Sequence, residues 1–153
     1  MLGAMVEIRL LGAGDEHLLA RLALDDAAFD LAGRGRPRTP LDADSAAAYL
    51  ADAHVLHWVA EDDRVVVGHL LCHVQRRRSG RARELLLYEI GVRDGHRRRG
   101  VGRALVGAME TWMRAHAVDD VWVLADNDGA VAFYEACGFA RDDAQPTQMS
   151  RTL

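Results

Sequence analysis

Hydrophobic and polar positions along the chain follow two periods, which predicts a mixture of strands and helices. Alternating and short apolar runs predict strands at 6–11, 55–61, 65–74, 83–92 and 121–125, with a last pair at 139–141 and 147–151. Apolar residues at helical spacing predict helices at 15–29, with Asp15 as N-cap, and at 45–53, 101–117 and 129–136. This order predicts a single α+β domain over residues 1–153, with one mixed sheet and helices on both faces. The helix at 101–117 implies that the strands before and after it run parallel.

The composition is that of an ordinary globular protein, with 153 residues of which 50% are hydrophobic and 27% charged. The two cysteines, Cys72 and Cys137, make no disulfide framework. No leader-like segment follows Met1, and no run approaches the ~20 apolar residues of a membrane span. We therefore expect a cytoplasmic protein with no membrane partner. The formal net charge of -4 argues against nucleic acid as a partner, and a homodimer stays open.

A glycine loop between a predicted strand and a predicted helix carries the most chemical information. It reads His-Arg-Arg-Arg-Gly-Val-Gly-Arg over residues 96–103. A helix start presents unpaired backbone N–H groups and the positive end of the helix dipole. Gly100 and Gly102 let a bulky anion approach the backbone closely. The loop therefore predicts a site for a phosphate or pyrophosphate group.

Two common phosphate loops do not fit this segment. A Walker A loop contains Gly-Lys-Ser/Thr, and this chain has no lysine, since all 19 of its basic residues are arginine. The dinucleotide fingerprint needs a third glycine where Leu105 stands. What remains is the pattern Arg-x-x-Gly-x-Gly between a strand and a helix.

The first pattern consists of Arg97, Gly100 and Gly102. A second pattern lies downstream and consists of Asn127, Ala130, Ala132, Phe133, Tyr134, Glu135, Gly138 and Phe139. The two patterns together resemble the GNAT superfamily of N-acetyltransferases over residues 85–139. The resemblance implies the GNAT fold, acetyl-CoA as co-substrate, and a bulge at Gly91 that frees backbone groups for the pantetheine arm. It implies coenzyme contacts at Ile90, Gly91, Val92, Arg97, Arg98, Arg99, Gly100, Val101, Gly102, Arg103, Asn127, Ala130 and Tyr134.

Acetyl transfer to an amine requires a base for the amine and a proton for the leaving thiolate. The resemblance places Tyr134 near the coenzyme sulfur, where its phenol, with a reference pKa of ~10, keeps a proton to donate. Glu89 is the candidate base, because strand alternation places it on one face with Leu85 and Leu87, where an apolar setting raises a carboxyl pKa. Asp126 is the rival base. A packing role for Tyr134 and an ion-paired structural role for Glu89 stay open.

The acceptor amine is indicated by a narrower resemblance. The segments 87–98 and 125–134 resemble the GNAT-type aminoglycoside 3-N-acetyltransferases. Aminoglycosides are polycations, which carboxylates attract. We expect the substrate to be bound by Asp25, Asp26, Asp30, Glu89, Asp126, Asp128, Asp142 and Asp143. A polyamine, another small amine or a protein N-terminus stays open as acceptor, and a non-catalytic acyl-CoA-binding module is the alternative from another class.

The remaining polar clusters predict no further chemistry. The histidines His54, His57, His69 and His73 show no metal-ligand spacing with cysteines or carboxylates, so no metal is expected. The arginine cluster at 76–83 surrounds Ser79 and is typical of a solvated hairpin tip rather than of a nucleic-acid patch, because no aromatic residues are interleaved with it.

Overall fold

The computed structural model describes residues 6–29, 35–144 and 146–153, and its five strands form one sheet in the order β1-β2-β3-β4-β5. The strands are β1 (Glu7–Leu10), β2 (Val55–Asp62), β3 (Val65–Arg76), β4 (Arg83–Val92) and β5 (Val121–Val123). The helices are α1 (Glu16–Leu24), α2 (Ala43–Ala51), α3 (Val101–Ala115) and α4 (Asp128–Ala136), with a 3-10 helix, η1 (Asp26–Phe29), after α1. Strands β1 to β4 are antiparallel, and β5 runs parallel to β4, as the crossover through α3 predicted.

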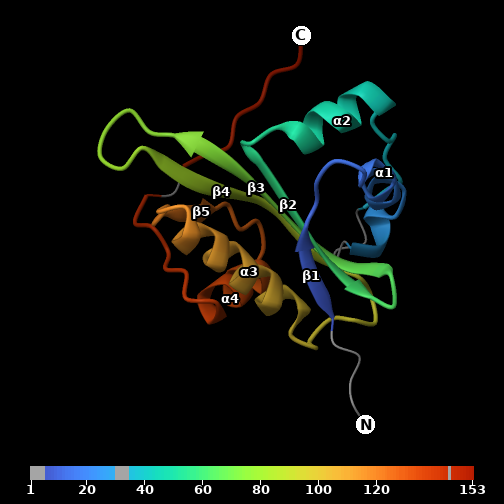
Figure 1. Cartoon of the computed structure of the whole chain (residues 1–153). Coiled ribbons are helices and arrows are strands. Elements are labelled where there is room, and N and C mark those ends of the chain that lie inside the picture. The colour runs from blue at the N-terminus through green and yellow to red at the C-terminus, as the bar shows by residue number, and fades with distance from the viewer. Residues whose placement is uncertain (1–5, 30–34, 145) are drawn as a thin grey trace.

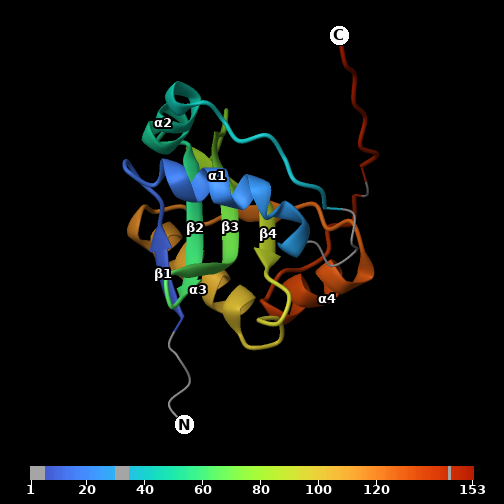
Figure 2. The ribbon, with the colours of Figure 1, turned by 90° about the vertical axis from the view of Figure 1, so that its right-hand side faces the viewer.

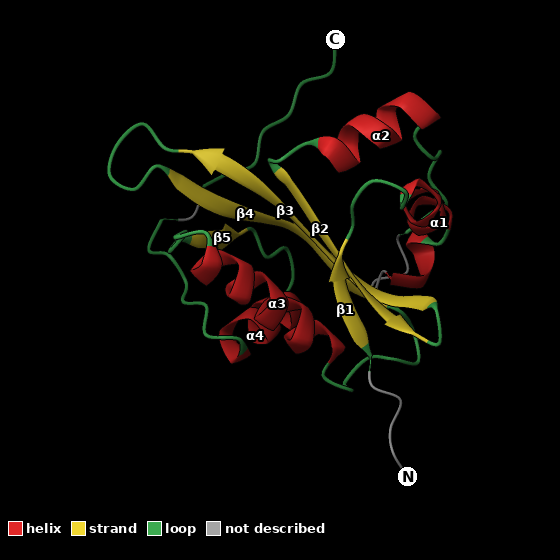
Figure 3. Ribbon diagram, in the orientation of Figure 1, coloured by secondary structure: helices red, strands yellow, loops and turns green. Residues whose placement is uncertain are grey.

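Helices cover both faces of this mixed sheet, which confirms the predicted α+β architecture. Figures 1 and 3 show α1 and α2 on one side of the sheet and α3 and α4 on the other. Figure 2 shows α1 lying across β2, β3 and β4. A larger apolar core lies between the sheet and α3 and α4, and a smaller one lies between the sheet and α1. The position of a residue on a strand therefore decides to which of two packed layers it belongs.

The apolar stripe of α3 explains how this helix closes one face of the sheet. Its buried side chains are Val101, Leu105, Val106, Met109 and Met113. Trp112 also lies on α3 but is half-buried, and its ring stacks on His116 with centroids 4.0 Å apart. The helix thus packs through branched and sulfur-containing side chains, and the indole lies at the border of the core.

A bulge in β4 changes the direction of the side chains that follow it. Leu87 pairs with Cys72 of β3, and Glu89 pairs with Leu71, so Tyr88 is an extra residue on β4. Since side chains alternate between the faces of a sheet, one extra residue moves all later side chains to the other face. Leu87 and Cys72 belong to the core beneath α3. Glu89 therefore lies on the opposite face, toward α1 and α2.

The prediction that Glu89 shares a face with Leu85 and Leu87 is wrong for this reason. Gly91, two residues further on, lies on the same face as Glu89. A Cβ on Gly91 would lie 2.9 Å from the Cβ of Phe29 in η1. The bulge expected at Gly91 is at Tyr88, and Gly91 instead permits close packing of η1 on the sheet.

The two strands β4 and β5 separate beyond the bulge. Their pairing ends at Leu87 and Val123, and among the described residues no β5 partner faces β4 from 88 to 92. β5 is also shorter than the predicted strand at 121–125. Backbone groups on this edge of β4 are therefore open toward the space between the strands.

The helix predicted at 15–29 is interrupted. α1 ends at Leu24, and the chain continues as η1 after Asp25. Asp25 forms an ion pair with Arg93 at 2.9 Å, which ties the break to the end of β4. Asp15 does not cap α1 with its side chain but accepts hydrogen bonds from the Gly12 N–H and from Arg9.

The pair of strands predicted at 139–141 and 147–151 does not form in the described residues. The described segments 139–144 and 146–153 contain no strand and are mostly exposed, with Met149 at 89% exposure. Figure 1 shows the end of the chain running away from the rest of the molecule. Short alternating runs form strands when a neighbouring strand pairs with them. Phe139 packs on the core, but among the described residues no strand pairs with either run.

Candidate active site

A cleft with a volume of about 1870 Å³ lies where β4 and β5 separate. The end of β4, the loop before α3, the start of α3, the segment after β5 and part of α4 form its walls. A typical ligand pocket measures ~300–1,000 Å³, so this cleft has space for two substrates. Of the predicted site residues, the cleft brings together Asp26, Glu89, Ile90, Gly91, Val92, Arg97, Arg98, Gly100, Val101, Gly102, Arg103, Asp126, Asn127, Ala130 and Tyr134.

The start of α3 has the geometry of an anion site. Gly100 precedes the helix with a φ of 82°, in the left-handed region that glycine adopts without strain. Its carbonyl accepts the hydrogen bond from the Ala104 N–H at 2.9 Å. The first N–H groups of a helix have no partner within it and carry the positive end of the dipole. Since Val101, Gly102 and Arg103 line the cleft, this terminus opens into it.

Arg97 holds the loop before α3 in place. Its Nε donates to the Val92 carbonyl at 2.9 Å, and its Nη1 pairs with Asp94 at 2.6 Å. The remaining Nη2 of Arg97 and the Nδ1 of His96 are buried with no hydrogen-bond partner. Buried polar atoms are nearly always paired. Both atoms therefore fit a site whose polar ligand completes their hydrogen bonding, as an anion with several oxygen atoms does.

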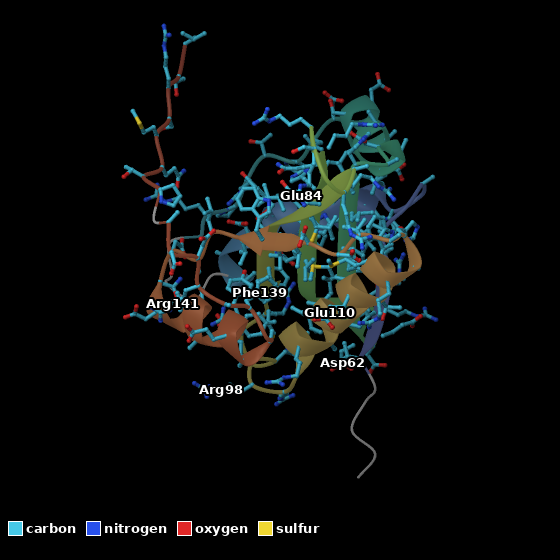
Figure 4. All side chains as sticks on the ribbon, turned by 90° about the vertical axis from the view of Figure 1, so that its left-hand side faces the viewer. Asp62, Glu84, Arg98, Glu110, Phe139 and Arg141 are labelled. Carbon is cyan, nitrogen blue, oxygen red and sulfur yellow. The ribbon has the colours of Figure 1, made fainter. Side chains whose placement is uncertain are left out.

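The other arginines of this loop differ in their position. Figure 4 shows Arg98 on the outside of the loop that precedes α3. Arg98 and Arg103 line the cleft, and both are exposed. Arg99, which was predicted to contact the coenzyme, is exposed and does not line the cleft, because the turn before Gly100 directs it to solvent.

Two residues fix the position of α4 beside α3. A Cβ on Gly102 would lie 3.0 Å from Cε2 of Phe133, so glycine allows the close approach of the two helices. Asn127 caps α4, because its Oδ1 accepts the Ala130 N–H at 2.8 Å while its Nδ2 donates to Asp126 at 2.8 Å. The second motif thus positions the helix that carries Tyr134.

Tyr134 is buried at 7% exposure within the core beneath α3 and α4 and still lines the cleft. Its ring packs against Phe133 and Phe139, with centroids 5.3 Å apart in each pair. Burial raises the pKa of Tyr134 to about 12, and the thiol of Cys72 and the carboxylate of Asp126 act in the same direction. The phenol therefore keeps its proton at neutral pH and can donate it.

Glu89 approaches the cleft from the other layer of the fold. Burial raises the pKa of its carboxyl group, the positive charge of Arg38 opposes this, and the negative charge of Asp26 adds to it. The bulge at Tyr88 places Glu89 on the α1–α2 face, whereas Tyr134 belongs to the α3–α4 layer. A carboxyl group with a raised pKa and a protonated phenol thus flank one cleft from opposite faces of the sheet.

The group of carboxylates at the cleft is smaller than the sequence predicted. Asp26, Glu89 and Asp126 line it. Asp25 does not, because it pairs with Arg93 at 2.9 Å and Arg21 at 3.0 Å, and Arg93 holds the pKa of Asp25 below its usual range. Three further predicted substrate residues are exposed and do not line the cleft: Asp128, Asp142 and Asp143. Asp30 falls outside the described residues.

Sequence reasoning missed two groups of cleft residues. Arg36 and Arg38 line the cleft, and Arg38 Nε pairs with Asp26 at 3.2 Å. The run 35–38 has a loop composition and gave no signal of its own. His69 also lines the cleft and contacts His57, with Nδ1 and Nε2 at 3.2 Å. The predicted strands at 55–61 and 65–74 are neighbours in the chain, so the pairing of these two strands could have predicted that His57 and His69 lie close together.

A profile of the acetyltransferase (GNAT) family matches residues 21–139. The chain belongs to this family. It is 32% identical to N-acetyltransferase 8 of Rattus norvegicus over 102 residues, which cover 65% of this chain and 46% of that protein. It is 35% identical to N-acetyltransferase 8B of Rattus norvegicus over 103 residues, with 65% and 46% covered. The chain thus spans less than half the length of these curated relatives.

Solved structures share the GNAT fold with this chain. The aminoglycoside acetyltransferase meta-AAC0020 from a soil metagenomic sample, in complex with trehalose, aligns with a TM-score of 0.84 at 18% identity over 100% of this chain and 99% of its own. The ribosomal-protein-alanine N-acetyltransferase of Brucella melitensis aligns with a TM-score of 0.74 at 21% identity, covering 97% and 100%. Aminoglycoside N-acetyltransferase AAC(6')-Iy, in complex with CoA, aligns with a TM-score of 0.71 at 17% identity, covering 95% and 100%.

The described part of the chain, residues 6–29, 35–144 and 146–153, offers neither a membrane-spanning helix nor a metal site. None of its helices has the length and apolar character to cross a membrane. No group of three or more His, Cys, Asp and Glu side chains in the same residues has the arrangement of a metal site.

Proposed function

We propose that this chain is an acetyl-CoA-dependent N-acetyltransferase domain that acts on a small cationic amine. One observation carries the proposal: a single cleft joins the start of α3 to the half-buried carboxyl group of Glu89 and the phenol of Tyr134. A binding module needs only the anion site at α3. The two titratable groups beyond it supply the base and the acid that acyl transfer requires.

The coenzyme would be held by the backbone of two segments. The N–H groups at Gly100, Val101 and Gly102 would bind its phosphates, and Arg98 and Arg103 add positive charge. The open edge of β4 at 90–92 offers backbone groups to the amides of the pantetheine arm. When bound, the coenzyme supplies a thioester carbonyl as the electrophile.

Glu89 and Tyr134 divide the proton chemistry. An ammonium group is not a nucleophile, so a base must first take its proton. The raised pKa of Glu89 makes its carboxylate a better proton acceptor than an exposed one. Tyr134, with a pKa of about 12, would give its proton to the leaving thiolate. Asp126 lines the cleft as well and is the rival base.

The acceptor that we propose first is an aminoglycoside, acetylated on its 3-N amine. The carboxylates of Asp26, Glu89 and Asp126 line one cleft, which favours a polycation. The short resemblance at 87–98 and 125–134 supports the 3-N position, and the fold shared with aminoglycoside acetyltransferases is compatible with it. Acetylation would remove a positive charge from the antibiotic and so confer resistance.

One observation favours a second candidate acceptor. Arg36 and Arg38 line the same cleft as Asp26 and Glu89, and Arg38 pairs with Asp26 and acts on Glu89. We call this end of the cleft the acceptor end. The Arg38–Asp26 ion pair leaves Arg36 as a further positive charge. A guanidinium beside the base would bind the carboxylate of an amine that also carries an acidic group, as an amino acid does.

A panel of amines tests both candidates. Release of free thiol from acetyl-CoA is measured with gentamicin, spermidine, single amino acids and a short peptide. We expect gentamicin to be turned over with the highest kcat/KM and its KM to rise with salt. A higher kcat/KM for amino acids than for gentamicin, together with loss of that preference in Arg36→Gln, would favour the second candidate acceptor over the aminoglycoside. Tight binding of acetyl-CoA with no thiol release from any amine would favour the binding module and refute the enzyme.

A further inference from the structure

Tyr49, His57 and His69 form a hydrogen-bonded row beneath the acceptor end of the cleft, which we call the histidine chain. The Tyr49 Oη lies 2.9 Å from Nδ1 of His57, and Nε2 of His57 lies 3.2 Å from Nδ1 of His69. His57 and His69 are 7% and 9% exposed. Burying polar groups costs free energy unless they are hydrogen-bonded, and the nitrogen atoms between these residues are paired.

The histidine chain connects the cleft to helix α2. His69 lines the cleft together with Glu89. The Nε2 of His69 faces Gly91, since a Cβ placed on Gly91 would lie 3.1 Å from it. At the other end, Tyr49 is half-buried in α2 and does not line the cleft. A path of three side chains therefore leads from the presumed acceptor site through β3 and β2 to α2.

The surroundings of His69 keep it neutral. The ring of Phe29 meets it edge-on with centroids 5.2 Å apart, and the paired Asp26 and Arg38 act on it with opposite signs. Burial lowers the pKa of His57 to about 3 and that of His69 to about 4. Each imidazole thus has one N–H and one lone pair at neutral pH. Such a row can pass a proton along, but it holds an additional proton poorly.

Acetylation of an ammonium group removes two protons from one nitrogen. R–NH₃⁺ and the thioester become R–NH–CO–CH₃, the free thiol and one released proton. The thiol takes its proton from Tyr134, and the proton that Glu89 takes from the ammonium group replaces that one by way of water. The second proton stays on the nitrogen until the nitrogen–carbon bond forms, when Glu89 is already protonated, so a second acceptor close to the nitrogen would remove it within the same turnover.

We propose that the histidine chain is this second acceptor, which takes the second proton from the nitrogen while the nitrogen–carbon bond forms. This inference rests on the proposed acetyltransferase function. As the nitrogen–carbon bond forms, His69 Nε2 takes a proton from the nitrogen, whose electron pair stays behind. The proton on His69 Nδ1 passes to His57 Nε2, the proton on His57 Nδ1 passes to Tyr49 Oη, and Tyr49 releases its own proton to water.

One proton enters this row and one leaves it, so no charged imidazole remains buried. At the end of the transfer, the proton of each histidine has moved from Nδ1 to Nε2. After the product has left, the reverse shift restores the starting tautomers: Tyr49 takes a proton from water, and His69 Nε2 gives one to water in the emptied cleft. The row therefore clears the nitrogen of its second proton during bond formation, and the net release to solvent follows product release. His57 and Tyr49 act through His69 and are positioning residues, whereas His69 touches the acceptor and is the catalytic residue of the three.

The kinetic test removes the outer hydroxyl alone. Tyr49→Phe keeps the ring beside His57 and should lower kcat about 10-fold with unchanged KM for both substrates, because the second proton loses its exit. His69→Ala should lose about 10²-fold in kcat and regain part of it when imidazole is added. His54→Gln, an exposed histidine away from the cleft, is the matched control and should keep the kcat of the wild-type chain. The solvent deuterium isotope effect on kcat should change in Tyr49→Phe and not in the control.

A second test does not depend on the acceptor. Nitrogen-15 NMR reports the charge and tautomer of His57 and His69 at pH 7. We expect both to be neutral, and Tyr49→Phe to change the tautomer of His69, which Tyr49 does not contact. The proposal would be overturned if His69 is charged at pH 7, or if its tautomer is the same in Tyr49→Phe as in the wild-type chain.

The outcomes separate this inference from the proposed function. If the wild-type chain turns over an amine and Tyr49→Phe has the same kcat and isotope effect, the proton route is wrong and the acetyltransferase stands. If no amine is turned over, the proposed acceptor fails. The kinetic comparison then uses the slow hydrolysis of acetyl-CoA, in which water is the acceptor, and an unchanged rate in Tyr49→Phe again refutes the route.

Discussion

Gly91→Ala tests whether the contact between η1 and β4 shapes the acceptor end of the cleft. The added methyl group would lie 2.9 Å from Cβ of Phe29 and 3.1 Å from Nε2 of His69. Ordinary contacts between such atoms are about 3.5–4.0 Å, so both neighbours must move by roughly half an ångström or more. Neither atom is the end of a flexible side chain, because one is next to the backbone and the other belongs to a buried ring.

The expected cost follows from this overlap. Inserting a methyl group into a packed region costs about 1–3 kcal/mol of unfolding free energy. At roughly 2–4 °C per kcal/mol for a domain of this length, Tm should fall by about 2–12 °C. Because His69 and Phe29 line the cleft, their displacement should also raise the KM for the acceptor amine. The KM for acetyl-CoA should change less, since the start of α3 lies at the other end.

Thermal unfolding and steady-state kinetics measure the two effects, with Gly107→Ala as the matched control. Gly107 lies inside α3, and an added Cβ would meet no atom within 4 Å. That substitution should leave Tm unchanged or raise it, because alanine favours a helix interior by up to about 1 kcal/mol over glycine. Equal or higher Tm for Gly91→Ala, with unchanged acceptor KM, would refute the proposed packing of η1 on β4.

Four further substitutions test the coenzyme site and the titratable groups Tyr134, Glu89 and Asp126. Gly100→Asp should abolish acetyl-CoA binding in calorimetry, because it strains a residue at φ 82° and places a negative charge beside the phosphates; unchanged affinity would contradict the site. Tyr134→Phe should lower kcat by about 10² with little change in acetyl-CoA affinity, and an unchanged kcat where chemistry limits the rate would eliminate Tyr134 as the acid. Burial raises the pKa of Glu89, so kcat/KM of the wild-type chain should fall as pH drops through that pKa. Glu89→Gln should lose this acidic limb, and its persistence there but not in Asp126→Asn would make Asp126 the base.

The sequence predicted the local elements well where a repeating pattern and a motif agreed. The apolar stripe of α3 and the glycine loop before it identified both the helix and its exposed start. The order of elements also predicted that β4 and β5 run parallel. These features depend on neighbours in the chain, for which sequence spacing is a direct measure.

Tertiary packing decided where the elements end. α1 stops at Leu24 because Asp25 pairs with Arg93, a residue distant in sequence. The alternating runs at 139–141 and 147–151 form no strand in the described residues, since no sheet strand pairs with them, although Phe139 packs on the core. Both results depend on partners that spacing along the chain does not reveal.

The candidate site shows the same division. The sequence alone determined which residues could bind a phosphate group and which could exchange protons, because these are properties of side-chain chemistry and of a helix start. It did not determine that Tyr88 is an extra residue in β4, and so it placed Glu89 on the wrong face. It also did not join His69 to His57 or bring Arg38 to Asp26. A bulge and contacts between separate strands and loops are settled by the packing of the whole chain, and only the tertiary structure decides them.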